Sequence, residues 1–487
     1  MKLALKAATF HVRMLRTRLP FRYGAVTLTH VPLLHLAVDV ETEEGRRSRG
    51  YAADNLPPKW FDKDPGKSFR DNVEDELAAI RGAEAAYRDA ARAPRPFFEI
   101  WQEAYAAARA SALARGLNGL TASFGSSFFE RALADAAGRL TGLDVPGMLR
   151  ANALGLHPEA VHGSLALADL QAWASATPPD RLAVRHTVGL LDPITAADVP
   201  ADGWLDDGLP QTLEECIARY GLDHFKLKVG GALDADLERL TAIAATVDRL
   251  VPGPYVATLD GNEQYKSMDD FAGLVDAMLR TPALARLRSS LAFIEQPLHR
   301  AIALDPAATD GLAALGRRLP MLIDESDDAL DAFPRAIALG YRGVSTKNCK
   351  GIVKSFLNRS LVERENRRRT PRERLFMSAE DLTNVPVVPL QQDLATVRAL
   401  GITHVERNGH HYVRGLAHCS AAERREATRR HAGLYTGDER AVILCIDGGR
   451  LDVRSLAVPG YGVAFEPDLA AMIPLEDWTS ASLEDTA

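Results

Sequence analysis

The chain has 487 residues, of which 46% are hydrophobic and 25% are charged, and its formal net charge is −7. This length exceeds that of a single ordinary domain and is enough to bury a large core. The composition is ordinary for a soluble enzyme, and the negative charge disfavours nonspecific binding to nucleic acid. No stretch approaches the roughly 18 apolar residues of a membrane-spanning helix. We therefore expect neither a nucleic-acid partner nor a membrane partner.

The cysteines are far apart in the sequence and form no CxxC pair; they are Cys216, Cys349, Cys419 and Cys445. Such spacing favours a reduced cytoplasmic compartment over a disulfide framework. The first residues, Met-Lys-Leu-Ala-Leu-Lys, hint at a signal peptide, but Arg13, Arg16 and Arg18 interrupt any apolar segment that could follow. We interpret this stretch as a first strand and predict a cytoplasmic protein.

The N-terminal part of the chain mixes strand and helix patterns. Residues 25–41 alternate apolar and polar side chains and predict a strand, and a further strand is expected to end near Tyr51. Helical spacing then predicts three helices, at residues 71–92, 97–115 and 123–143. Residues 154–180 fit no predicted element.

Five short apolar runs in the second half each end in charged or amide residues, at 225–228, 259–262, 293–297, 322–326 and 344–348. The charged residues that end them follow one another by 32, 35, 29 and 23 residues, which is the spacing of a strand plus a crossover helix. In a parallel barrel, catalytic groups lie at the C-terminal ends of the strands. Five side chains should therefore face one pocket: Lys228, Asp260, Glu295, Asp324 and Lys347.

The charges of these side chains indicate a metal site. Three convergent carboxylates, Asp260, Glu295 and Asp324, would raise one another's pKa values unless a cation lay between them. An oxygen-only ligand set favours Mg²⁺, with Mn²⁺ as the alternative, over zinc. Lys226 and Lys228 are two residues apart, so both should point into the barrel from one strand. Burial beside a cation should lower a lysine's pKa and make it an acid/base candidate near pH 7.

The five segments resemble those of the enolase superfamily, and most closely its muconate-lactonizing and dipeptide-epimerase branch (the mandelate racemase/muconate lactonizing enzyme family). The resemblance implies an α/β fold, a modified TIM barrel of the (β/α)7β type, with an α+β capping domain formed from both ends of the chain. It implies a cap at 1–180, a barrel at 181–430 and a C-terminal return to the cap at 431–487. The remaining barrel strands are expected at 184–191, 375–377 and 402–405. The resemblance also places a mobile cap loop at 19–24, a cap helix at 131–138 and the return segment at 458–462.

The same resemblance implies an Mg²⁺-dependent isomerase that removes the proton α to the carboxylate of a small acid. Lys228 and Lys347 would be the acid/base residues on opposite sides of the barrel mouth, and Lys226 and the metal would stabilise the enediolate. Racemisation, epimerisation and cycloisomerisation remain open. The alternatives are a lyase on the same scaffold, either an acid-sugar dehydratase or an o-succinylbenzoate-synthase-like enzyme, and a catalytically silent binding barrel. We expect a small-molecule carboxylate substrate and a homo-oligomer.

The sequence alone does not decide the roles of several residues. Polar neighbours of the ligands either orient them or are ordinary loop residues: Asn262, Gln296, Glu325, Asn348 and Glu406. His404, His410 and His411 could bind a metal, but surface or substrate contact fits them at least as well. Trp60 could touch substrate, although packing is the simpler role. Strand eight carries Glu406-x-Asn408 where dipeptide epimerases have Asp-x-Asp, which disfavours a dipeptide substrate. Strand seven lacks the histidine base of the mandelate-racemase type.

Overall fold

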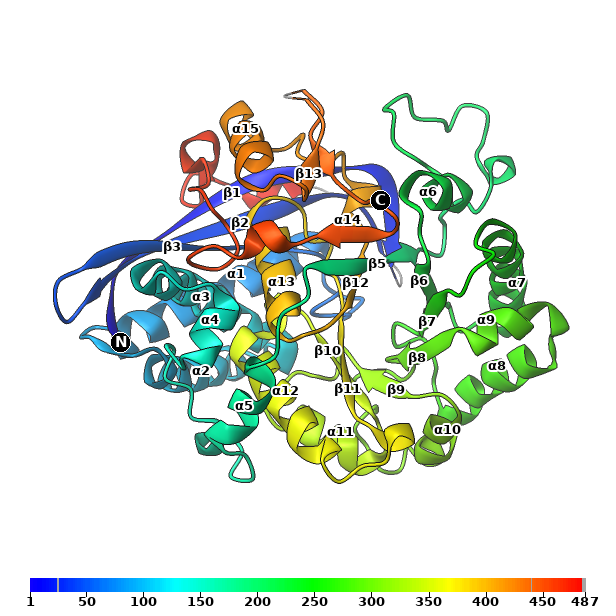
Figure 1. The fold of residues 1–487 in the computed structure, drawn as a ribbon, viewed down its shortest axis with the longest axis horizontal. Coiled ribbons are helices and arrows are strands. Elements are labelled where there is room, and N and C mark those ends of the chain that lie inside the picture. The colour runs from blue at the N-terminus through cyan, green and yellow to red at the C-terminus, as the bar shows by residue number, and fades with distance from the viewer. Residues whose placement is uncertain (24–25, 439, 484–487) are drawn as a thin grey trace.

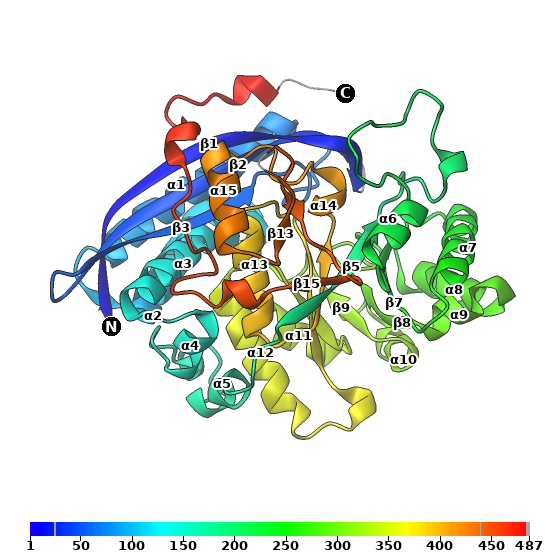
Figure 2. The same cartoon turned by 45° about the horizontal axis from the view of Figure 1, so that its top comes forward.

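The structure is a computed structural model that describes residues 1–23, 26–438 and 440–483. A long antiparallel sheet and a group of helices lie against a barrel of parallel strands (Figure 1), and the C-terminal segment runs back over that sheet (Figure 2). Within the described residues, no helix is long and apolar enough to cross a membrane.

The cap sheet has the strand order β16-β1-β2-β3, with β4 also paired to β1. Its strands are β1 (Lys2–Tyr23), β2 (Val26–Thr42), β3 (Arg47–Asn55), β4 (Arg95–Pro96) and β16 (Ile473–Pro474). The predicted loop at 19–24 is different: residues 19–23 belong to β1, and Gly24 lies outside the described residues. The pairing of β1 with β2 shifts register between Arg16 and Phe21, and β1 continues beyond this irregular stretch.

Three helices cover one face of this sheet, α1 (Phe69–Ala90), α2 (Phe97–Ala114) and α3 (Gly119–Thr141). The third begins earlier than predicted because the Asn118 side chain accepts hydrogen bonds from the Leu120 and Thr121 backbone amides and so caps the helix. On its buried face, Arg131 pairs with Asp54 of β3 at 2.6 Å. The cap helix and cap sheet are therefore joined by charge as well as by packing.

The unassigned stretch after α3 connects cap and barrel through α4 (Val145–Arg150), η1 (Pro158–Ala160) and α5 (Leu167–Ala174). The α5 helix packs on barrel helix α12 (Ile352–Asn366), where Trp173 Nε1 donates to Ser360 Oγ at 3.0 Å. These elements are too short for a clear periodic signal, which is why the sequence did not indicate them.

Within the described residues, eight parallel strands form the barrel, which closes where β12 pairs with β5. The strands are β5 (Arg181–Val188), β6 (His224–Lys228), β7 (Val256–Asp260), β8 (Leu291–Glu295), β9 (Met321–Ile323), β10 (Gly343–Thr346), β11 (Phe376–Ala379) and β12 (His404–Arg407). The five charged segments are thus the ends of β6 to β10, as predicted. The strands predicted at 375–377 and 402–405 end too early because the paired backbone of β11 and β12 continues into residues beyond the apolar runs. The strand predicted at 184–191 ends too late because the apolar residues there continue past the end of β5.

Helices alternate with the barrel strands: α6 (Leu213–Tyr220), α7 (Leu233–Leu250), α8 (Met268–Arg280), α9 (Ala285–Ser289), α10 (Leu312–Arg318), α11 (Ala332–Leu339), α12, α13 (Val388–Ala399), α14 (Gly409–Tyr412) and α15 (Ala421–Arg430). Short 3₁₀ turns are η2 (Ala196–Asp198), η3 (Pro282–Leu284), η4 (Asn348–Lys350), η5 (Pro371–Glu373), η6 (Arg454–Leu456), η7 (Leu469–Ala471) and η8 (Ser480–Leu483). This alternation agrees with the predicted modified TIM barrel.

The C-terminal segment ties barrel and cap together. Strands β13 (Tyr435–Thr436) and β14 (Ile443–Leu444) form a small ribbon, and β15 (Arg450–Asp452) pairs antiparallel with β5. Gly449 has φ +68° and approaches Gly221 O so closely that a side chain could not fit. Farther on, the Tyr461 amide donates to Asp135 of α3 at 2.7 Å. The predicted return to the cap is therefore present.

Burial of His35 in β2 should make the stability of the protein depend on pH. Burial, with the charge of Arg13, lowers the pKa of His35 from 6.5 to about 3. Below pH 6.5 His35 is protonated in the unfolded chain but stays neutral in the folded chain. Protonation therefore stabilises the unfolded state, and the free energy of unfolding decreases as pH falls. Chemical denaturation at pH 7 and at pH 5 measures how much the free energy of unfolding decreases between the two pH values. This decrease should be about 2 kcal/mol smaller for His35→Gln than for the native chain. Equal losses would contradict this, and the exposed His299→Gln is the control.

Candidate active site

The charged residues at the strand ends lie at one level of the barrel. Parallel pairing places Lys228 of β6 beside Asp260 of β7, and Asp260 beside Glu295 of β8. Asp324 follows β9, and Lys347 follows β10. All of these side chains are buried. The register between the strands therefore brings together residues that the sequence only placed at separate strand ends.

Lys226 lies at the centre of the cluster. Its Nζ is 2.9 Å from Asp260 Oδ2, 2.6 Å from Glu295 Oε2, 2.9 Å from Glu380 Oε2 and 2.8 Å from Glu406 Oε2. The predicted inward direction of Lys226 is confirmed, and Leu227 between the lysines packs in the apolar core. One ammonium group thus holds carboxylates from four different strands or strand ends together.

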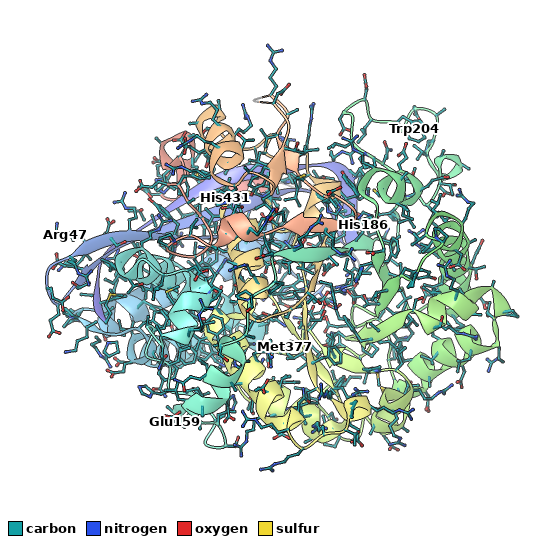
Figure 3. All side chains as sticks on the ribbon, viewed as in Figure 1. Arg47, Glu159, His186, Trp204, Met377 and His431 are labelled. Carbon is teal, nitrogen blue, oxygen red and sulfur yellow. The ribbon has the colours of Figure 1, made fainter. Side chains whose placement is uncertain are left out.

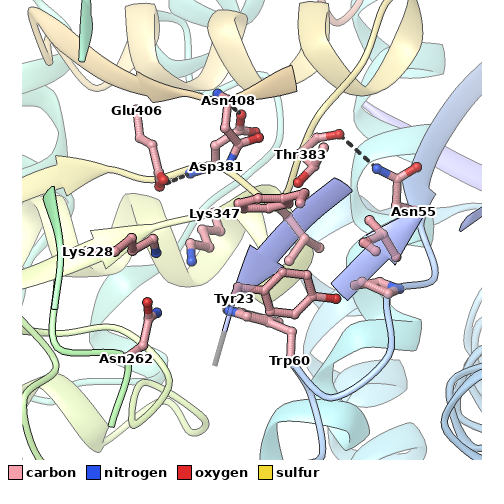
Figure 4. Close-up of a pocket in the computed structure, with 14 residues that line it drawn as sticks. Tyr23, Asn55, Trp60, Lys228, Asn262, Lys347, Asp381, Thr383, Glu406 and Asn408 are labelled. Atoms are coloured by element: carbon pink, nitrogen blue, oxygen red, sulfur yellow. Dashed lines mark hydrogen bonds between the residues drawn. The ribbon is translucent and has the colours of Figure 1, made fainter. Parts of the chain in front are cut away.

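The two lysines predicted as acid and base occupy different sides of this cluster. Lys228 Nζ donates to Asp260 Oδ2 at 2.5 Å, and Lys347 Nζ donates to Asp324 Oδ2 at 2.6 Å. Both side chains point toward the same pocket (Figure 4). Lys350 also contacts Asp324, at 3.2 Å, but it turns away toward Asp327. Lys347 is accordingly the lysine of this segment that reaches the pocket.

The expectation of low lysine pKa values is wrong for this arrangement of charges. Burial by itself lowers the pKa of Lys226, but the attraction of Asp260 and Glu295 outweighs it and holds that pKa well above its usual range. For Lys347, burial is likewise outweighed by Asp324, and its pKa is raised. The sequence argument assumed a metal ion as the nearest charge, whereas here carboxylates are the nearest charges.

The carboxylates fit a divalent cation in donor type, and one of their buried oxygens lacks a hydrogen-bond partner. Among the described residues, Glu295 Oε1 has no hydrogen-bond partner, whereas Glu295 Oε2 is paired with the Lys226 ammonium at 2.6 Å. Burial, then Asp260, raises the pKa of this group well above its usual range. A hard cation would satisfy the oxygen that the lysine leaves without a partner. The ligand atoms of Asp260, Glu295 and Asp324 are not all within 4.8 Å of one another in the described chain, because lysine ammonium groups lie between them.

Two of the predicted orienting residues support the ligands directly. The backbone N–H of Asn262 donates to Asp260 Oδ1 at 2.9 Å, and the Asn262 side chain lines the pocket. Gln296 Oε1 accepts a hydrogen bond from the Asp324 amide at 2.8 Å, and Gln296 Nε2 donates to Ser326 Oγ. These contacts hold the carboxylate of Asp260 and the backbone of Asp324 in position.

The other predicted orienting residues differ from one another. Glu406 belongs to the charged cluster through Lys226 and also accepts from Thr187 Oγ1 at 2.7 Å. Glu325 has no hydrogen-bond partner for either oxygen among the described residues, and burial beside Asp324 raises its pKa to about 7. Asn348 instead accepts from Thr396 Oγ1 at 2.8 Å, which is a packing contact away from the pocket.

Glu380 and Arg185 belong to the cluster but were not predicted. Glu380, at the end of β11, contacts Lys226, and the guanidinium of Arg185 donates to Glu380 Oε1 at 2.5 Å. Arg185 is fully buried and comes from β5. A charged residue inside the apolar run of the first strand was the available signal, because an arginine there needs a buried carboxylate.

The pocket has an apolar wall from the cap and a polar wall from the barrel (Figure 4). The cap contributes Phe21, Tyr23, Leu28, Asn55, Pro57 and Trp60, and the barrel contributes Lys228, Asn262, Lys347, Asp381, Leu382, Thr383, Glu406 and Asn408. Trp60 packs, as expected, but its ring also lies 4.5 Å from Lys347 Nζ and faces the pocket.

The cap segment that carries Trp60 is anchored to barrel loops. Arg300 donates to the carbonyl oxygens of Trp60 and Phe61, both at 2.8 Å, and to Glu263 at 2.8 Å. Lys63 Nζ donates to Asn262 O at 3.0 Å. The apolar wall is thus held against the charged wall by specific polar contacts.

The histidines near strand eight divide into two groups. His404 lies at the beginning of β12 beside His224, with ring centroids 5.8 Å apart, and is distant from the pocket end of the strand. His410 and His411 are on α14, at the pocket end.

Replacing Glu380 with glutamine should destabilise the fold, because Arg185 and Lys226 then keep buried charges with too few partners. We expect the unfolding free energy to fall by about 3–5 kcal/mol, the usual cost of breaking a buried ion pair. Chemical denaturation measures this, with the exposed Glu373→Gln as matched control, which should change it by less than about 0.5 kcal/mol. A loss no larger than that of the control would mean that this pair does not support the barrel.

No protein-family model matches the chain, and no curated protein matches its sequence. Solved structures match it over nearly its whole length. The 2-chloromuconate cycloisomerase from Rhodococcus opacus 1CP is 16% identical, with a TM-score of 0.59 over 95% of this chain and 97% of that one. The L-Ala-D/L-Glu epimerase from Bacillus subtilis is 14% identical, with a TM-score of 0.58 over 95% and 99%.

A dipeptide epimerase from Enterococcus faecalis V583, solved with Mg and the dipeptide L-Leu-L-Tyr, is 14% identical, with a TM-score of 0.57 over 96% of this chain and 100% of that one. At such identities the similarity concerns the fold. The chain therefore has the fold of the mandelate racemase/muconate lactonizing branch of the enolase superfamily, a modified TIM barrel with a capping domain.

Proposed function

We propose that this protein is a divalent-metal-dependent isomerase of the mandelate racemase/muconate lactonizing type, which removes the proton α to a carboxylate and returns a proton to the same molecule. The observation that carries the proposal is that Lys228 and Lys347 reach one pocket from different sides of a buried carboxylate cluster. The fold shared with a cycloisomerase and two epimerases supports the same reaction class.

Asp260, Glu295 and Asp324 would hold the metal, with Mg²⁺ preferred and Mn²⁺ as the alternative. When bound, the cation would supply positive charge for the substrate carboxylate and for the negative charge that develops on it. The ammonium groups of Lys226, Lys228 and Lys347 now neutralise these carboxylates, so lysine and cation would compete for the same oxygens. The oxygen-only donor set and the Glu295 Oε1 that lacks a hydrogen-bond partner among the described residues support this assignment.

The lysines divide the proton chemistry. Lys228, at the end of β6, and Lys347, after β10, would approach the α-carbon from opposite faces, so that one removes the proton and the other returns it. Lys226 would hold positive charge beneath the substrate, where preorganised electrostatics act on the developing anion. Trp60 and the rest of the apolar wall would exclude water from these groups.

The apolar wall also selects the substrate class. Phe21, Leu28 and Pro57 offer no side-chain hydrogen-bonding partner to a polyhydroxylated acid, and with the ring of Trp60 they fit an apolar or aromatic group attached to the reacting carboxylate. An apolar carboxylic acid is therefore favoured over an acid sugar. A lyase acting on an apolar acid would begin with the same proton removal, and product analysis separates it from an isomerase. The homo-oligomer and the cytoplasmic location stay predictions from the sequence.

Deuterium exchange tests the proton chemistry. In D₂O with Mg²⁺, the native protein should incorporate deuterium at the α-carbon of apolar carboxylic acids, chosen from a pool of N-acyl amino acids, dipeptides, lactones and sugar acids. Lys228→Ala and Lys347→Ala should each slow exchange at least about 100-fold, the usual contribution of a general acid or base. With a chiral substrate, each variant should lose exchange mainly from one stereoisomer. Mass spectrometry and NMR measure both effects.

The control is Lys266→Ala, an exposed lysine outside the pocket, which should exchange like the native protein. Exchange that continues unchanged in both pocket variants would contradict the assigned roles. Complete absence of exchange with every acid, despite measured Mg²⁺ binding, would favour the silent binding barrel.

Metal removal tests the ligand set separately. Chelation should abolish exchange, and calorimetric titration with Mg²⁺ should show one binding event in the native protein that is lost in Asp260→Asn. The exposed Asp269→Asn serves as the matched control. Retention of Mg²⁺ binding in Asp260→Asn would place the metal elsewhere.

A further inference from the structure

A second group of metal-ligating side chains lies behind the catalytic pocket. It consists of His186 of β5, Cys216 of α6 and His411 of α14, and each is at most 3% exposed. Among the described residues, this is the group whose ligand atoms all lie within 4.8 Å of one another. The three elements are neighbours in both ribbon views (Figure 1, Figure 2), and His186, labelled in Figure 3, is a buried residue of β5.

The spacing of the donor atoms suits a transition-metal ion. Cys216 Sγ is 3.6 Å from His411 Nδ1. Metal–nitrogen bonds of about 2.0–2.1 Å and a metal–sulfur bond of about 2.3 Å, arranged tetrahedrally, separate nitrogen from sulfur by roughly 3.6 Å. A fourth donor is close at hand, because His186 Nδ1 is 3.1 Å from His410 Nε2.

The histidines are held in the state that binds metal. Burial lowers the pKa of His186 and of His411 to about 3, although the charge of Asp192 opposes this shift at His186, so both imidazoles are neutral near pH 7. Burial raises the pKa of the Cys216 thiol, so a metal ion would displace its proton to solvent on binding. In the described chain, His410 Nδ1 has no hydrogen-bond partner. Three buried donors, His186, Cys216 and His411, are therefore close together, with the half-buried His410 beside them.

The surrounding charges are compatible with a cation. Asp192 lies beside His186 and accepts a hydrogen bond from Tyr412 at 2.5 Å. Arg18 approaches from the cap and donates to His411 O at 2.9 Å, but Asp207 neutralises it through a 2.5 Å ion pair.

We propose that His186, Cys216 and His411 bind one zinc-class divalent ion, with His410 as the adjacent fourth donor, at a site separate from the oxygen-only carboxylate cluster. Nitrogen and sulfur ligands select such ions and not Mg²⁺. Of the four donors, His410 also lines a small neighbouring cavity, together with Tyr220 and Arg407.

The ion would stabilise the back of the catalytic pocket. It would join β5, α6 and α14 more firmly than the His186–His410 and Cys216–His411 hydrogen bonds that already connect them. Tyr412 of α14 stacks on Phe21 at 4.1 Å, and Phe21 and Asn408 line the pocket. Binding at this site would therefore hold the cap strand and the end of strand eight in place, whatever reaction the pocket carries out.

Cobalt binding tests the proposal without any substrate. Metal-free native protein, titrated with Co²⁺ in excess Mg²⁺, should bind one equivalent with a thiolate-to-cobalt charge-transfer band and visible tetrahedral bands. Cys216→Ser should lose the charge-transfer band and bind Co²⁺ more than about 100-fold more weakly than the native protein. This threshold is used because loss of a group that only supports a metal ligand weakens metal binding by at most about 100-fold. Cys445→Ser, which changes a free cysteine outside the cluster, is the matched control, and Asp260→Asn should keep the full spectrum.

X-ray absorption of the native protein loaded with Zn²⁺ gives a result that does not depend on any variant folding. One sulfur and two or three imidazole nitrogens in the coordination shell would agree with the site. A shell of oxygens alone, or a cobalt spectrum that Cys216→Ser leaves unchanged, would overturn it. Because the readouts are spectra and stoichiometry, failure of this site and failure of α-proton exchange are distinguished.

Discussion

The mutual neutralisation of buried charges at the C-terminal end of the barrel is the constraint on which the rest of this structure depends. An unpaired charge in a protein interior costs several kcal/mol, so each charged strand end needs a partner. Lys226 meets this need for Asp260, Glu295, Glu380 and Glu406 at once, with distances of 2.6–2.9 Å. Arg185 completes the arrangement from β5. The register of the parallel strands has to be correct for any of these pairs to form.

The cap matters because it determines how strongly these charges act. A charge pair in a water-excluded site interacts far more strongly than one in solvent. Trp60 lies over Lys347, and Arg300 and Lys63 hold the surrounding cap segment onto the barrel loops. The apolar wall therefore has two consequences, since it favours apolar ligands and shields the lysines from water.

The region behind the pocket has the opposite chemistry. There, nitrogen and sulfur donors are buried beside β5, α6 and α14, while the pocket itself presents oxygens and ammonium groups. The stacked pair Phe21 and Tyr412 connects the two regions. One short helix, α14, thus transmits the position of the inner donors to the cap strand that faces the pocket.

The sequence by itself determined the barrel and the identity of its principal charged residues. The strand pattern and its spacing can be recognised in short stretches of neighbouring residues. The sequence alone therefore predicts the apolar runs and the charged residues that end them, which are Lys228, Asp260, Glu295, Asp324 and Lys347. The same argument could not find Arg185 and Glu380, which become partners only when the barrel closes between its first and last strands.

Contacts between distant segments were decided by the tertiary structure alone. The raised lysine pKa values, the apolar wall that Trp60 helps to form, and the approach of Cys216 to His411 across 195 residues all depend on how elements pack together. Local sequence specifies which strands and helices form, but the distances between their side chains follow from barrel closure and from the docking of the cap.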